Sequence, residues 1–160
     1  MAISKGRNIL TSSVYTAHIG NAADFWERFS KEIPPADEIV FISDGARWIW
    51  NYISERYPNS TQILDLYHCK EHIFQFANEF FTNELQAKEF AESICELLMA
   101  SKVDEALNRI RDLTAIGKKK QLQEKLLVYL ENNEKRIDYG KFIDKGLLVG
   151  SGAIESAHRK

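Results

Sequence analysis

EIVFISDGARWIWNYISERY, from Glu38 to Tyr57, predicts a strand followed at once by a helix. The short apolar run from Glu38 to Ser43 is typical of a buried strand. Asp44 and Gly45 then form a turn signal. From Ala46 to Tyr57 apolar residues recur at helical spacing, and a proline follows directly. A strand that turns into a helix is the repeating unit of α/β folds.

The segments on either side extend this alternation. β-branched residues predict a strand at Asn8–Thr16, and apolar residues at helical spacing predict a helix at Ala22–Glu32, which Pro34 ends. The apolar run Gln62–Tyr67 predicts another buried strand. The order strand, helix, strand, helix, strand favours an α/β core whose neighbouring strands run parallel.

The character of the sequence changes after Lys70. Between Lys70 and Tyr139 there is no proline and a single glycine, Gly117. Leucine, isoleucine and alanine recur there at helical spacing, so we expect three or four helices packed as a bundle. The glycine-rich run from Gly146 to Gly152 interrupts the pattern, and a last helix is predicted near Ala153.

These patterns define an expected domain organisation. Residues 1–70 and 146–160 would form the α/β core, and residues 71–145 would form an all-helical insertion. With 160 residues, the chain is long enough for one domain with a real core.

The composition excludes several classes of protein. The net charge of −2 means that the chain as a whole has no positive field to attract nucleic acid. Cys69 and Cys95 are too few for a disulfide framework, so a cytoplasmic location is the simplest expectation. No stretch approaches the roughly 18 consecutive apolar residues that suggest a membrane span.

One cluster of side chains could bind zinc. His68, Glu71 and His72 match H-x-x-E-H, the pattern of an inverted zinc metallopeptidase. Histidines four positions apart share one face of a helix, and the glutamate would act as general base. This interpretation needs a third ligand and needs His68 inside a helix. The alternative is that His68 ends a strand and His72 packs on the first turn of the next helix.

Two aspartates are associated with the predicted buried strands. Asp44 follows one strand, at the end where ligands collect in parallel sheets, although it could equally cap the following helix. Asp65 is predicted inside the other strand, where a carboxylate is costly unless it is paired, hydrogen-bonded or bound to a metal. Because the two strands are expected to pair, the aspartates are expected to lie close together.

A glycine-rich turn leads into the last predicted helix. In GSGAIESAHR, Gly150 to Arg159, Glu155 falls in the first helical turn and Arg159 lies near the same face. Ser151 and Glu155 are four positions apart, whereas a capping box needs three. Helix capping alone therefore explains this glutamate poorly.

Three blocks of this sequence, in their order, resemble the bacterial insertion-sequence transposases of the DDE type, related to the Mutator-like group. The blocks are FISDGARWIW, YPNSTQILDLYHCKEH and GSGAIESAHR. An all-helical stretch separates the last two, as in that family. The resemblance covers nearly the whole chain. It implies an α/β fold with a partial RNase H-like core, a mixed sheet with flanking helices, interrupted by the all-α insertion.

The resemblance also implies a site and its partners. In such enzymes three carboxylates hold two divalent metal ions, Mg²⁺ or Mn²⁺, for the cleavage and transfer of DNA strands. Asp44 matches the second carboxylate and Glu155 the third, and both would be metal ligands. Asp65 and His68 match a supporting element beside the active site, where His68 could contact DNA. Arg159 could contact a phosphate. The partner would be DNA, at transposon ends and at the target.

The chain departs from the family at the first carboxylate. Asp24 and Asp37 are predicted on a helix or loop and do not fit that role, and nothing matches the N-terminal DNA-binding region. We therefore expect a fragment or truncated copy, with an incomplete metal site, that is inactive alone. A different possibility is a non-catalytic module that pairs with itself or with a full-length transposase. A bare sheet edge and an exposed apolar patch would favour it.

Overall fold

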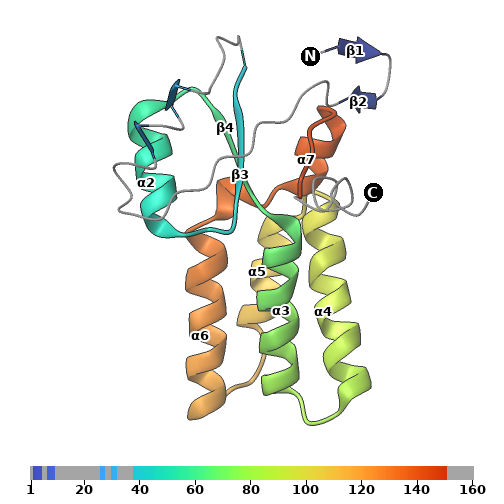
Figure 1. Ribbon diagram of the computed structural model, residues 1–160. Helices are drawn as coiled ribbons and strands as arrows, with labels where there is room; N and C mark the ends of the chain where they lie inside the picture. Colours follow the sequence, from blue (N-terminus) through green and yellow to red (C-terminus); the bar gives the residue numbers. More distant parts are fainter. Residues whose placement is uncertain (1, 5–6, 10–25, 28–29, 32–37, 151–160) are drawn as a thin grey trace, which may run out of the picture. The chain divides into compact units, whose positions relative to one another are not determined.

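The computed structural model describes residues 2–4, 7–9, 26–27, 30–31 and 38–150, and the chain divides into two units between Ile39 and Val40 (Figure 1). In the first unit, β1 (Ala2–Ser4) pairs antiparallel with β2 (Arg7–Ile9). Residues 26–27 and 30–31 are helical, inside the predicted helix. The strand predicted at Asn8–Thr16 is described only at its first two residues, which belong to β2; Asp24 and Asp37 lie outside the described residues.

The second unit begins with the predicted strand–helix–strand. β3 (Val40–Ser43) leads into α2 (Arg47–Arg56), and β4 (Thr61–Leu64) returns beside β3. The two strands are parallel, with Val40 opposite Thr61 and Ser43 opposite Leu64. The expected parallel pairing is confirmed for this pair of strands.

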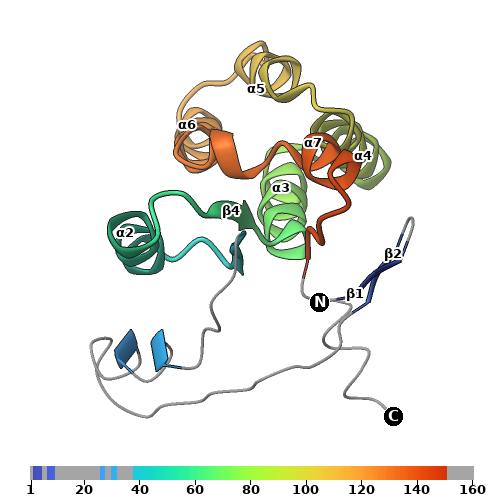
Figure 2. The ribbon, with the colours of Figure 1, turned by 90° about the horizontal axis from the view of Figure 1, so that it is seen from above.

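A helical bundle follows, as the periodicity predicts. Figure 1 shows its long helices side by side, and in the end-on view of Figure 2 they form a ring. Its elements are α3 (Leu66–Phe80), α4 (Glu84–Met99), α5 (Val103–Arg111), α6 (Lys118–Glu131), the short 3₁₀ turn η1 (Glu134–Arg136) and α7 (Tyr139–Asp144). α3 packs against α4 and α6, and α5 packs against the same two helices.

The sheet and the bundle share one hydrophobic core. Ile63 and Leu64 of β4 are fully buried in the same cluster as Ile73 of α3, Leu130 of α6 and Tyr139 of α7. Because such interiors are close-packed, the bundle and the sheet support each other directly. The predicted boundary between residues 70 and 71 falls inside α3, which runs across it without a break.

The described residues are consistent with the α/β fold class. These residues are mainly helical, with a small parallel sheet of two strands in the second unit. Cys69 and Cys95 are buried free thiols. Within the described ranges, none of the helices combines the length and the apolar character needed to cross a membrane.

Candidate functional site

Asp44 and Asp65 follow two paired strands at the same level of the sheet. Ser43 and Leu64 are register partners, and each aspartate is the next residue along its chain. The N–H of Asp65 donates to the carbonyl of Ser43 at 2.8 Å, which extends the pairing by one residue. Both aspartates line one pocket of about 410 Å³, together with His68. The carboxyl ends of the strands therefore form the shared wall that their pairing predicts.

Asp44 holds the turn after β3. Its side chain is exposed, and its Oδ1 accepts from the N–H of Ala46 at 3.1 Å and from the Ser43 hydroxyl at 3.3 Å. The N-cap residue of α2 is Ala46, and no side chain caps this helix. The interpretation of Asp44 as the helix cap is therefore wrong. Its carboxylate stays at the surface of the pocket, where a ligand can reach it.

Both the backbone conformation at position 45 and the space around it favour glycine. Its φ of +93° is a backbone conformation that residues with a side chain rarely adopt. A Cβ placed on it would lie 2.8 Å from Cδ1 of Leu64, closer than carbon atoms normally approach. The glycine thus lets the chain turn tightly against β4, and this turn sets the position of Asp44.

The prediction that Asp65 lies inside a strand is wrong. β4 ends at Leu64, α3 begins at Leu66, and Asp65 is the N-cap between them. Its Oδ1 accepts from the N–H groups of Tyr67 at 2.9 Å and of His68 at 3.1 Å, and the side chain is buried. These bonds satisfy two of the donors that a helix leaves free at its start. The buried carboxylate is thus accounted for by the first turn of α3.

His68 and His72 lie on the same helix, so the strand-end interpretation of His68 is also wrong. Their ring centres are 4.9 Å apart, and Nδ1 of His68 lies 3.4 Å from a carboxylate oxygen of Glu71. This is the shared face that the zinc interpretation needs. The third ligand is not found: within the described residues no three His, Cys, Asp or Glu side chains are grouped to hold a metal.

His72 packs between helices. Its ring centre lies 4.2 Å from that of Tyr129 on α6. Burial lowers the pKa of His72 below its ordinary value, and the neighbouring His68 and Lys125 lower it further. The uncharged ring is therefore favoured. This is the packing role that the alternative interpretation predicted for His72, although on the second turn of α3 rather than the first.

Tyr129 belongs to this region and was not predicted. A Cβ on Gly45 would lie 3.7 Å from the Tyr129 hydroxyl, so α6 reaches the turn after β3. Burial raises the pKa of Tyr129, and Cys69, Asp44 and Asp65 raise it further, so the phenol stays neutral. No local signal in the sequence indicates which distant turn this tyrosine meets.

The chain after α7 returns to the site. The N–H of Leu66 donates to the carbonyl of Val149 at 2.9 Å. A Cβ on Gly150 would lie 3.1 Å from the ring of Tyr67, which lines the same pocket as Asp44. Glu155 and Arg159 lie outside the described residues, a few positions beyond this contact.

The chemistry of the described carboxylates can be compared with the needs of a divalent metal. An exposed carboxylate such as Asp44 is the hard oxygen ligand that Mg²⁺ and Mn²⁺ prefer. Oδ1 of Asp65 is already used by two backbone N–H groups. Asp44 therefore suits a divalent metal by its chemistry, but the described residues contain no group of three side chains that could hold one.

No family model matches this chain. Searches of curated proteins and of solved structures find no significant match either.

Proposed function

We propose that this chain carries part of the catalytic centre of a DDE-type DNA transposase, with Asp44 and Glu155 as two of its metal-binding carboxylates. The observation that supports it best is the pocket at the carboxyl ends of β3 and β4, which Asp44, Asp65 and His68 line together. These are the residues of the first two blocks that resemble the family. Bound Mg²⁺ or Mn²⁺ would activate water or a 3′-hydroxyl and stabilise in-line attack on a DNA phosphate.

The residues around Asp44 have distinct roles in this proposal. Asp44 is the exposed carboxylate, and its hydrogen bond to Ala46 holds it at the pocket. Asp65 is a positioning residue, because it fixes the backbone of Tyr67 and His68 at the start of α3. His68 then presents a partly exposed ring beside Glu71, from which it can contact a DNA strand.

The contact between Leu66 and Val149 supports the proposal that Glu155 lies at the pocket. The segment before Glu155 is hydrogen-bonded to the first residue of α3, beside the pocket. Five residues separate Gly150 from Glu155 (155 − 150 = 5), and an extended chain spans at most about 3.6 Å per residue. A span of at most roughly 18 Å is long enough for Glu155 to reach the pocket, as the proposal requires.

The proposed centre is incomplete. The first carboxylate of the family's triad has no counterpart in this chain, so we expect weak metal binding and no strand transfer by the chain alone. The proposal includes an RNase H-like core, a cytoplasmic location, DNA at transposon ends and target as partner, and pairing with a second copy or a full-length transposase.

We also propose, as an alternative, a binding module in which an edge of the sheet accepts a strand of a second chain. Within the described residues β3 pairs with β4. Sedimentation of the chain over a wide range of concentrations tests self-pairing. A constant monomer mass, also when a full-length transposase of the resembling group is added, would contradict this alternative.

Calorimetry with Mn²⁺ and with Zn²⁺ tests the main proposal. Asp44→Asn keeps an oxygen that can accept from Ala46 but removes the charge, and Glu155→Gln does the same for the second ligand. Asp104→Asn on α5 is the matched control, because Asp104 is also exposed. We expect the Mn²⁺ affinity to fall at least roughly 10-fold in the first two variants. Removal of a group that merely hydrogen-bonds a metal ligand already lowers metal affinity by about that factor. The control should bind like the unaltered chain.

Two results would contradict the proposal. Tight Zn²⁺ binding that is lost in His72→Ala would favour the zinc metallopeptidase instead. Mn²⁺ binding that is absent, or equally weak in all three variants, would remove the metal-binding role of Asp44 and Glu155.

A further inference from the structure

A pocket rich in arginine adjoins the candidate site. It has a volume of about 380 Å³ and begins at Gly45, the residue after Asp44. Its walls come from the turn after β3, from α2, and from the chain between the end of α6 and η1. We call it the arginine pocket and define it by Gly45, Arg47, Trp50, Asn51, Asn132 and Arg136. Two guanidinium groups and three side-chain amides, that of Asn133 included, line it, and no described aspartate or glutamate does.

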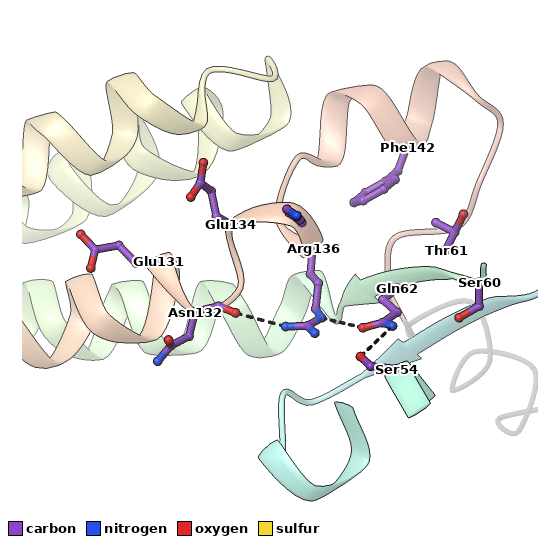
Figure 3. Close-up of a pocket in the computed structure, with 10 residues that line it drawn as sticks. Ser54, Ser60, Thr61, Gln62, Glu131, Asn132, Glu134, Arg136 and Phe142 are labelled. Atoms are coloured by element: carbon purple, nitrogen blue, oxygen red, sulfur yellow. Dashed lines mark hydrogen bonds between the residues drawn. The ribbon is translucent and has the colours of Figure 1, made fainter. Parts of the chain in front are cut away.

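Arg136 is a half-buried cation with neutral neighbours. Its Nε donates to Oε1 of Gln62 at 2.9 Å, and its Nη1 donates to the carbonyl of Asn132 at 3.1 Å (Figure 3). The guanidinium also lies 4.6 Å from the centre of the Trp50 ring. No carboxylate in the described part of the chain is within ion-pair distance of it. A cation withdrawn from water without a counter-ion favours an anionic ligand.

Two residues that line the pocket carry buried donors without a hydrogen-bond partner among the described residues. Trp50 is 4% exposed, and its indole N–H has no hydrogen-bond acceptor among the described residues. The hydroxyl of Tyr129, which also lines the pocket, is equally without a partner there. Unsatisfied buried donors are rare in folded proteins and call for an explanation.

Arg136 also lines a second pocket, of about 530 Å³, whose character differs. Glu131 and Glu134 line that pocket (Figure 3), together with Lys135. Glu131 forms an ion pair with Arg111 at 2.7 Å. Because no described carboxylate lines the arginine pocket, an anion is expected there rather than beside the two glutamates.

We propose that the arginine pocket binds a phosphate of a DNA strand, next to the phosphate that lies at Asp44; this inference rests on the proposed function. The planar guanidinium matches the oxygens of a phosphate, and stacking on Trp50 fixes the orientation of Arg136 in advance. Asn51 and Asn132 can donate further hydrogen bonds. Because the whole chain carries a net charge of −2, attraction to DNA has to be local.

Fluorescence anisotropy of a labelled DNA oligonucleotide, with a chelator present, tests the pocket without metal. Arg47→Gln is the main variant because this side chain is exposed, so its loss should leave the fold intact. Arg136→Lys keeps the charge but loses the fork of donors. Arg109→Gln is the matched control, an exposed arginine on α5. We expect both pocket variants to bind more weakly, and Arg47→Gln to lower the salt slope of the affinity by about 1. The control should change neither.

Each other result overturns the inference. Equal weakening in Arg109→Gln would show diffuse attraction, and unchanged affinity in both pocket variants would remove the pocket from the DNA path. Inorganic phosphate that displaces the oligonucleotide at comparable concentration would indicate a site for free anions rather than for DNA. Mn²⁺ calorimetry on Arg47→Gln separates the two proposals, because metal binding should persist there whatever happens to the oligonucleotide.

Discussion

Leu66 and Val149 are joined by a backbone hydrogen bond of 2.9 Å, from the N–H of Leu66 to the carbonyl of Val149. Leu66 is the first residue of α3, and Val149 lies in the segment after α7. This bond brings the end of the described chain back to the strand ends that carry Asp44 and Asp65. The proposed role of Glu155 relies on this return of the chain.

Replacement of Leu66 by proline should release this segment while preserving α3. Proline is tolerated at the first position of a helix, and the ψ of 124° at Asp65 suits a residue that precedes proline. Leu66→Ala is the matched control, since it loses the side chain but keeps the N–H. Hydrogen exchange at residues 147–150 should be faster in the proline variant than in the alanine variant. Equal exchange would mean that this bond does not hold the segment.

Asp65→Ala should destabilise the protein, and Asp65→Asn should not do so to the same extent. Alanine leaves the N–H groups of Tyr67 and His68 without an acceptor, whereas asparagine retains one. Loss of an N-cap costs roughly 0.5–2 kcal/mol of unfolding free energy, and burial favours the upper end. Urea unfolding measures it. If both variants unfold at the same urea concentration, the charge of Asp65 rather than its cap stabilises α3.

Gly45→Ala should be more destabilising than Gly117→Ala. Both glycines have positive φ, so each substitution introduces backbone strain of roughly 1–3 kcal/mol. A Cβ on Gly117 meets nothing within 4 Å, whereas one on Gly45 meets Leu64 at 2.8 Å. Urea unfolding of the two variants separates overlap from strain. Equal losses would show that Leu64 moves aside at little cost.

Stability should fall as the pH drops through about 6.5, the ordinary pKa of histidine. Burial lowers the pKa of His72 in the folded state, so the unfolded chain binds the proton more readily. The contribution of His72 is complete above the unfolded pKa and is lost as the pH falls toward the folded one. Unfolding between about pH 7.5 and pH 5.5 measures this loss, which should shrink in His72→Gln. An NMR titration midpoint of His72 at or above 6.5 would contradict the prediction.

The sequence alone predicted the local elements well. β3 and α2 lie within a few residues of their expected bounds, and the helical stretch after Lys70 forms a bundle. Periodicity succeeds here because each element buries one face, and the apolar residues of that face recur at a fixed spacing within a short window of sequence. The error at Asp65 is also local. Leu64 and Leu66 continue the apolar run of the strand, but the hydrogen bonds of Asp65 to the next turn start a helix between them.

Tertiary packing decided what surrounds Asp44. Tyr129 and Arg136 lie far along the chain, and they reach the turn after β3 and the ring of Trp50 only because α6 and η1 pack against the sheet. Spacing in the sequence carries no signal for such contacts, since they depend on how whole helices meet. The sequence by itself determined β3, α2, the helical character after Lys70 and the place of Asp44 at the end of its strand. The fold alone placed the cations and aromatic rings beside it, because long-range burial rather than local pattern sets those distances.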